Sequence, residues 1–170
     1  YHHKSADWAA NKPHPLTGWT AAELAKLPTY YVMPRDKTMA ETVAAEMPTP
    51  SEIAACRWLT DAELAVYAEE YGRNGFQGGL QSYRVGRVAR LSAELTLFAG
   101  RTIDVPATFI SGKSDWGVFQ RAGSFEAMQK SACTNFRGAH LLDGAGHWVQ
   151  QEQPAKVAEL VLQFVRGNRA

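Results

Sequence analysis

Two short apolar runs in the last 70 residues restrict the fold more than any other feature of the sequence. Residues 105–110 are apolar and β-rich and end in Ser-Gly, and residues 139–142 end in Asp-Gly-Ala-Gly. A helix is expected over 119–130 between them, and another follows Pro154, a residue that suits the first position of a helix. The order strand, helix, strand, helix predicts two parallel strands of an α/β sheet. Two strands cannot bury both of their faces, so we expect them to belong to a larger sheet.

The first 100 or so residues lack this pattern and are expected to form only helices and loops. Residues 1–18 are expected to be loop. A Thr followed three residues later by Glu is a helix start signal, and it occurs at Thr20, Thr38 and Thr60. The expected helices run over 21–27, from 38 to near Pro48, from a Ser51 cap toward Trp58, from 60 to the glycines at 72 and 75, and from 80 to about 90.

The helix after Thr60 has an apolar face that includes Tyr67 and Tyr71, which predicts that both tyrosines pack in the core. The contrast between the two halves predicts a helical domain over 1–95 and an α/β segment over 96–170.

Composition excludes several classes of function. Apolar residues make up 45% of the chain and charged residues 21%, and 18 basic against 17 acidic residues give a net charge of +1. We therefore expect no nucleic-acid partner and no anionic membrane surface as partner. No apolar run approaches the roughly 18 residues that a membrane span needs. Cys56 and Cys133 form no CxxC motif, and they fit a reducing compartment, so we expect a cytoplasmic protein.

The two loops that follow the predicted strands carry the residues with the clearest chemistry. Asp115 lies in Ser111-Gly-Lys-Ser-Asp-Trp-Gly117, and His147 lies in Gly144-Ala-Gly-His-Trp148. Sites in open α/β sheets are built at the carboxyl ends of the strands. A carboxylate that accepts a hydrogen bond from one ring nitrogen fixes the tautomer and leaves the other nitrogen able to take a proton. Either residue alone is more often a turn or surface residue, but the pair in this order predicts an acid–base pair.

With these motifs the last 70 residues resemble the C-terminal part of an α/β-hydrolase fold enzyme. The resemblance implies that Asp115 is the acid and His147 the base of a catalytic triad, and the order of acid before histidine agrees with it. The helical half resembles the cap domain that such enzymes insert into their core.

The helical half also resembles the epoxide hydrolase branch of that superfamily. The segment Gly75-Phe-Gln-Gly-Gly-Leu-Gln-Ser-Tyr83-Arg84 is similar to the end of the cap, where a Tyr-Arg pair supplies a ring-opening tyrosine, although Ser82 replaces a frequent aromatic residue. Leu27-Pro-Thr-Tyr30-Tyr31-Val-Met33 is similar to the region of the other cap tyrosine, for which we favour Tyr30 over Tyr31. The residues expected to line the substrate pocket are Tyr31, Met33, Phe76, Trp116 and Trp148, with packing as the alternative role.

The implied reaction is hydrolysis of an epoxide to a vicinal diol through a covalent ester, without a metal or organic cofactor. Tyrosine hydroxyls are neutral at pH 7 and can protonate the epoxide oxygen as it becomes an alkoxide. His147 would then activate the water that hydrolyses the ester. The expected partners are a small apolar or aromatic substrate and water. His2, His3 and His14 occur without HExxH or a carboxylate cluster, so no metal site is expected.

The nucleophile of such an enzyme is not found in this sequence. A nucleophile elbow reads Gly-x-nucleophile-x-Gly, and the glycines four apart at 75 and 79 enclose Gln77, which cannot attack. We therefore expect the N-terminal half of the hydrolase core, with an Asp or Ser nucleophile, to lie outside this chain. The alternatives are a serine esterase or dehalogenase on the same scaffold, or a non-catalytic fragment or binding module. A homodimer is left open.

Overall fold

The computed structural model describes residues 12–88 and 92–168. The chain forms two compact units, one made of Tyr1–Trp58 together with Thr102–Ala170 and the other of Leu59–Arg101. The expected domain boundary near residue 95 stays a prediction. The helices of the first unit are α1 (Ala21–Leu24), α2 (Met39–Ala45), α3 (Pro50–Ala55), α7 (Ser124–Ala127), α8 (Val149–Glu152) and α9 (Pro154–Gly167).

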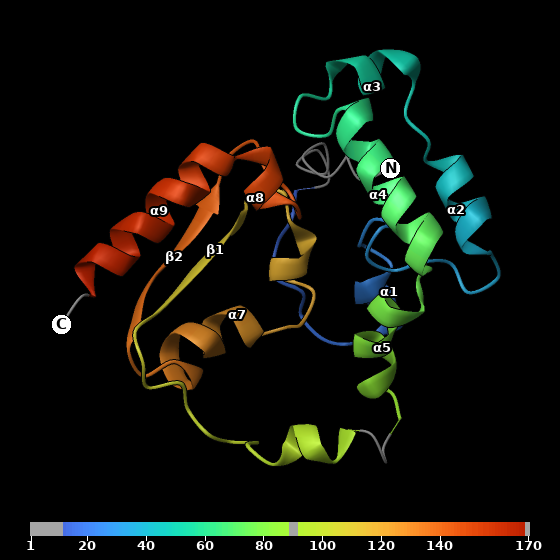
Figure 1. Ribbon diagram of the computed structural model, residues 1–170. Coiled ribbons are helices and arrows are strands. Elements are labelled where there is room, and N and C mark those ends of the chain that lie inside the picture. Colours follow the sequence, from blue (N-terminus) through green and yellow to red (C-terminus); the bar gives the residue numbers. More distant parts are fainter. Residues whose placement is uncertain (1–11, 89–91, 169–170) are drawn as a thin grey trace. The chain divides into compact units, whose positions relative to one another are not determined.

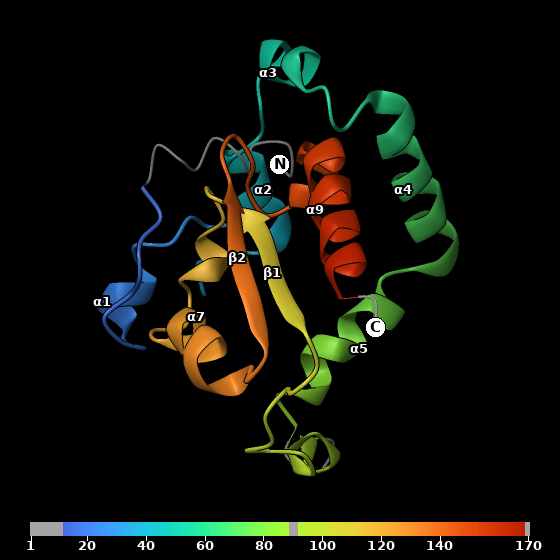
Figure 2. The same cartoon turned by 90° about the vertical axis from the view of Figure 1, so that its left-hand side faces the viewer.

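The centre of the first unit is a sheet of two parallel strands, β1 (Ala107–Gly112) and β2 (Phe136–Leu142), as the sequence predicts. In its register Ile110 lies opposite His140. The first strand begins after Pro106 rather than at Val105, because proline has no N–H to donate to a ladder. Helix α9 lies on one face of the sheet and α7 on the other (Figure 1, Figure 2). This arrangement confirms the α/β class of the C-terminal part.

The helix expected over 119–130 is wrong as a single element. Residues 116–132 instead form a 3-10 turn, η3 (Trp116–Val118), then α7, then a π-helical turn, η4 (Met128–Ala132). Two local features cause the breaks. The Asp115 carboxylate accepts the Gly117 N–H at 2.7 Å and so starts the 3-10 turn early. Gly123 adopts a φ of +75°, which is not a helical conformation, so no helix continues through this residue into α7.

The helix starts in the first unit follow the capping signals with two corrections. Thr49, not Ser51, caps α3, because Pro50 takes the first helical position and leaves Ser51 inside the first turn. Thr20 caps α1 as expected, but the Glu23 carboxylate accepts a hydrogen bond from the Thr17 N–H, and α1 ends at Leu24. Leu16, Leu27 and Trp116 then form a small buried cluster.

The second unit contains α4 (Asp61–Asn74), α5 (Gln77–Val85) and a 3-10 turn, η2 (Glu94–Thr96). Thr60 and Glu63 form the expected capping box of α4, and Gly75, with a φ of +68°, ends that helix. Helix α5 begins three residues earlier than expected, and it ends at Val85, so the expected extension to about Arg90 is wrong. Tyr67 and Tyr71 are 45% and 44% exposed, so their expected burial is wrong. Within the described residues of this unit, α4 and α5 offer too few elements to enclose the apolar face of α4.

Candidate active site

The structure brings the side chains of Asp115 and His147 together at the carboxyl ends of the two strands. Asp115 follows β1 in the turn after Gly112, and His147 follows β2 after residues 143–146. The His147 Nδ1 lies 3.2 Å from one carboxylate oxygen of Asp115 and 3.3 Å from the other. Asp115 is only 7% exposed, whereas the His147 side chain is 43% exposed. The carboxylate is therefore shielded while the imidazole can be reached from outside.

Asp115 is held by three further donors. The Tyr31 hydroxyl donates to its Oδ1 at 2.8 Å, the Ser111 hydroxyl to its Oδ2 at 3.0 Å, and the Gly117 N–H to its Oδ1 at 2.7 Å. Buried polar groups are costly unless hydrogen-bonded, and here every bond stabilises the ionised form. The carboxylate is consequently fixed in direction, with its charge available to the imidazole.

The charges of the pair stabilise each other. Burial acts to raise the pKa of Asp115, but hydrogen bonds from His147 and Tyr31 outweigh it and hold that pKa below its usual range. The hydrogen bond to Asp115 raises the pKa of His147 against the opposing effect of burial. Burial and the neighbouring Asp115 carboxylate raise the pKa of Tyr31, whose phenol is therefore a neutral donor.

Gly112 allows the two strand-end loops to meet. A Cβ at this position would lie 2.2 Å from the carbonyl oxygen of Gly146, a distance that real side chains do not tolerate. The Ser114 N–H donates to the carbonyl oxygen of Ala145 at 3.0 Å and joins the same two loops. Replacing Gly112 by any other residue would separate the loops that carry Asp115 and His147.

Glu152 holds the loop on both sides of His147. Its carboxylate accepts the Gly146 N–H at 2.7 Å and the Trp148 N–H at 2.9 Å. Because these residues flank His147, one side chain of α8 fixes the backbone of the base. Sequence reasoning missed Glu152 and Ser111. The signal for Glu152 was a carboxylate five residues after the histidine, at the end of a helix too short to predict.

Aromatic side chains surround the imidazole. The rings of Tyr30, Tyr31 and Trp148 lie 5.8, 5.9 and 5.5 Å from the His147 ring, all edge to face. The Trp148 indole N–H donates to the Tyr30 hydroxyl at 3.0 Å. Both tyrosines of the predicted pair are thus beside the histidine, where Tyr31 donates to Asp115 and Tyr30 accepts from Trp148.

The remaining predicted residues have other surroundings. Trp116 is 1% exposed and packs with Leu16 and Leu27, and its indole N–H has no partner among the described atoms. Met33 lies on the partly exposed segment after Tyr31. Phe76 and Tyr83 belong to the second unit, where Phe76 stacks on Tyr71 at 4.6 Å and Tyr83 lies on α5 with 71% of its surface exposed.

Neither a cluster of metal ligands nor a membrane-spanning helix occurs among the residues that the structure describes. Within residues 12–88 and 92–168, no three His, Cys, Asp or Glu side chains come together as ligands. His2 and His3 lie outside the described residues. None of the helices described has the length and apolar character to span a bilayer.

Comparison with known proteins finds relatives in sequence and in structure, although no family model matches the chain. The sequence is 35% identical over 112 residues to epoxide hydrolase B of Mycobacterium tuberculosis, covering 66% of this chain and 31% of that protein. It is 38% identical over 125 residues to epoxide hydrolase A of the same organism, covering 71% and 35%. A solved epoxide hydrolase from an endophytic Streptomyces matches with a TM-score of 0.68 and 30% identity, over 95% of this chain and 46% of that one.

The chain is epoxide hydrolase-like, within the α/β-hydrolase superfamily. The resemblance inferred from the glycine, histidine and tyrosine motifs is therefore confirmed. This epoxide hydrolase-like chain spans about a third of the length of the curated relatives that it matches.

Proposed function

We propose that this chain forms the cap and the C-terminal catalytic segment of an epoxide hydrolase, with Asp115 and His147 as the acid and base of its triad. The observation that carries the proposal is the contact of the His147 Nδ1 with the shielded Asp115 carboxylate at 3.2 Å. That contact directs Nδ1 at the acid and leaves Nε2 for a water proton. The nucleophile is supplied by polypeptide outside these 170 residues.

The proposed reaction has two steps. A carboxylate attacks one epoxide carbon, the carbon–oxygen bond breaks, and a tyrosine O–H transfers its proton to the oxygen that leaves. His147 Nε2 then takes a proton from water, the hydroxide attacks the ester carbonyl, and the diol and the free carboxylate are released. The imidazolium proton finally returns, through solvent, to the tyrosinate left by the first step, which restores both residues. Asp115 stabilises the imidazolium that forms. No metal or organic cofactor takes part.

We assign ring opening to Tyr83 and Tyr30. A phenol has one O–H group, and that of Tyr31 donates a hydrogen bond to Asp115 at 2.8 Å. This contact favours Tyr30, of the two adjacent tyrosines, as the second proton donor for ring opening. The Trp148 indole N–H orients the Tyr30 oxygen from the other side. Tyr31 is then a residue that positions the acid as well as a wall of the pocket.

The substrate is a small apolar or aromatic epoxide. Trp148 and Tyr31 provide aromatic surface beside the histidine. We also assign Met33 and Phe76 to the binding of the substrate. Trp116 contributes from the core, where the cluster that it forms with Leu16 and Leu27 packs against Tyr31. A cytoplasmic location fits the two cysteines, which form no disulfide.

The test is hydrolysis of styrene oxide and of a phenyl ester by the full-length polypeptide that carries this segment. Tyr83→Phe removes the proposed proton donor and should slow epoxide opening by about 100-fold or more. The matched control is Tyr67→Phe, another exposed tyrosine of the second unit, which should leave the rate unchanged. Unchanged epoxide turnover in Tyr83→Phe would overturn the role assigned to Tyr83. An ester rate that exceeds the epoxide rate would overturn the proposed function in favour of an esterase.

A further inference from the structure

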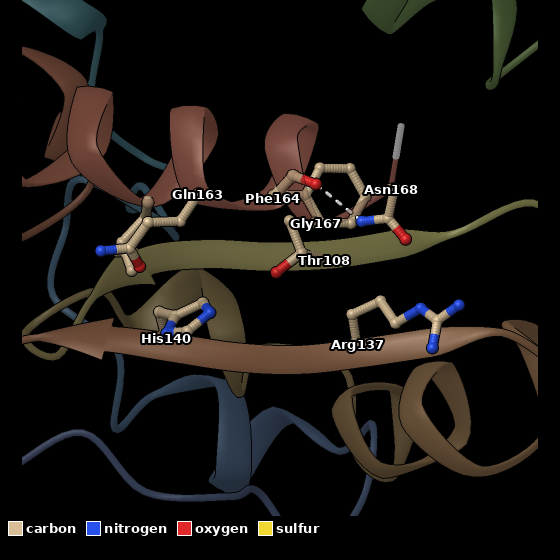
Figure 3. Close-up of a pocket in the computed structure, with 8 residues that line it drawn as sticks. Thr108, Arg137, His140, Gln163, Phe164, Gly167 and Asn168 are labelled. Atoms are coloured by element: carbon tan, nitrogen blue, oxygen red, sulfur yellow. Dashed lines mark hydrogen bonds between the residues drawn. The ribbon is translucent and has the colours of Figure 1, made fainter. Parts of the chain in front are cut away.

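A pocket lies between the sheet and α9, and two side chains of β2 that can donate hydrogen bonds line it. Its cavity is about 290 Å³, and the residues that line it include Thr108, Arg137, His140, Leu160 and Phe164. Figure 3 shows Arg137 and His140 on β2, with α9 along the opposite wall. The proposed reaction uses none of these residues.

A bulge in β2 brings these two side chains to one face. Side chains alternate along a regular strand, so residues 137 and 140 would point to opposite faces. The register, however, advances from Ala107–Phe136 to Phe109–Ala139, which places one extra residue in β2. Gly138 adopts a φ of +140° there, and its carbonyl oxygen accepts the Thr108 hydroxyl at 3.0 Å. Such bulges redirect side chains, and this one directs Arg137 and His140 into the same pocket.

Two acceptors of α9, the Glu159 carboxylate and the Phe164 carbonyl oxygen, already accept hydrogen bonds from other residues of this region. Glu159 accepts from Lys156 at 2.8 Å and from the Gln163 amide at 2.9 Å. The Phe164 carbonyl oxygen, near the negative end of the helix, accepts the Asn168 amide at 2.7 Å. Among the residues that the structure describes, no carboxylate forms an ion pair with Arg137. The guanidinium therefore has its donors available to a ligand.

We infer that this pocket binds a small organic acid, whose carboxylate or phosphate contacts Arg137 and His140 and whose apolar part lies against Leu160 and Phe164. A guanidinium presents parallel N–H donors that match the two oxygens of such a group. The imidazole adds one N–H in either tautomer. A cavity of about 290 Å³ is small and suits a ligand of one ring or a short chain.

The experiment is equilibrium dialysis of the full-length polypeptide that carries this segment against labelled benzoate, benzamide and inorganic phosphate. Benzoate should bind saturably at one site, whereas benzamide, which has the same shape without the charge, should bind about tenfold or more weakly. Phosphate that binds more tightly than benzoate would assign the site to a phosphate without an apolar part. Equal binding of benzoate and benzamide, or no saturable binding of either acid, would overturn the inference, and this arm needs no variant.

Variants then locate the site. Arg137→Gln should weaken benzoate binding by about tenfold or more. Arg137→Lys keeps the positive charge but loses the paired N–H donors of the guanidinium, so it should weaken binding less. The control is Arg121→Gln, an exposed arginine of the same unit that does not line the pocket. Thermal melting checks that each variant is folded. Equal losses in Arg121→Gln and Arg137→Gln would mean nonspecific attraction and would contradict the site.

Discussion

The strand-end site and the α4–α5 helices are built from contacts of different range. At the site, Asp115 meets His147 across 32 residues and Tyr31 across 84, and Trp148 reaches Tyr30 across 118. In the second unit, side-chain hydrogen bonds such as Thr60–Glu63 and Arg84–Gln77 join residues three and seven positions apart. The site therefore depends on the fold of its unit, whereas the helices depend on their own sequence.

The two regions also differ in what they bury. Asp115, Ser111 and Ser114 are buried polar residues, which are stable only because they are hydrogen-bonded. No residue of α4 or α5 is buried. A change at the site should therefore be costly and should act at a distance, while a change in the helices should stay local.

The largest expected effect is that of Asp115→Asn in the full-length polypeptide. The amide cannot stabilise the imidazolium and favours the wrong tautomer, so turnover of the epoxide should fall by about 1,000- to 10,000-fold. The control is Asp143→Asn, which removes an exposed carboxylate paired with Lys113. A loss of epoxide turnover of similar size in Asp143→Asn would show that the effect of Asp115→Asn does not come from its contact with His147.

The same variant makes a prediction about pH. His147 must be neutral to take a proton, and the hydrogen bond to Asp115 raises its pKa above the value of about 6.5 that is usual for histidine. The rate of the wild type should therefore rise with pH through a midpoint above 6.5, and in Asp115→Asn that midpoint should move to lower pH. An unchanged midpoint would contradict the coupling of the two residues.

A smaller effect is expected for Glu152→Gln. The amide can accept only one of the two N–H groups that flank His147, so the free energy of unfolding should fall by about 2 kcal/mol. Removing the negative charge should also lower the pKa of His147. Urea denaturation and NMR titration of the imidazole measure the two effects, with Glu126→Gln as the control. If neither quantity changes, Glu152 does not position the base.

The smallest effect belongs to the second unit. Thr60→Ala removes the cap of α4 and should cost about 1 kcal/mol in the local stability of that helix. Hydrogen exchange should speed up in α4, while the amides of β1 and β2 and the titration of His147 should not change. Faster exchange in the strands would break the distinction between the two regions.

The sequence predicted those parts that rest on local patterns. The capping boxes at Thr38 and Thr60, the proline that opens α9 and the two parallel strands were all predicted. It also predicted the pairing of Asp115 with His147, because residues after neighbouring parallel strands meet at one edge. The cap of α3 was misplaced because Thr49 and Ser51 can both cap a helix. Pro50 takes the first helical position, and Thr49 is therefore the cap.

The sequence did not predict the long-range partners that hold Asp115 and His147 in place. The hydrogen bond of Tyr31 to Asp115 joins residues 84 apart and leaves no spacing rule in the sequence. The hydrogen bonds of Glu152 to the loop of His147 depend on α8, a helix of four residues. The bulge at Gly138 shows only in the register of the strands.

The most direct test of the account is a single-turnover reaction of His147→Gln in the full-length polypeptide, followed by intact-mass spectrometry. The account predicts that the epoxide is opened and that the protein gains the mass of one substrate, because ester formation does not need the histidine and ester hydrolysis does. Diol released at the wild-type rate, with no increase in the mass of the protein, would contradict the role of His147 as the base of an Asp115–His147 pair.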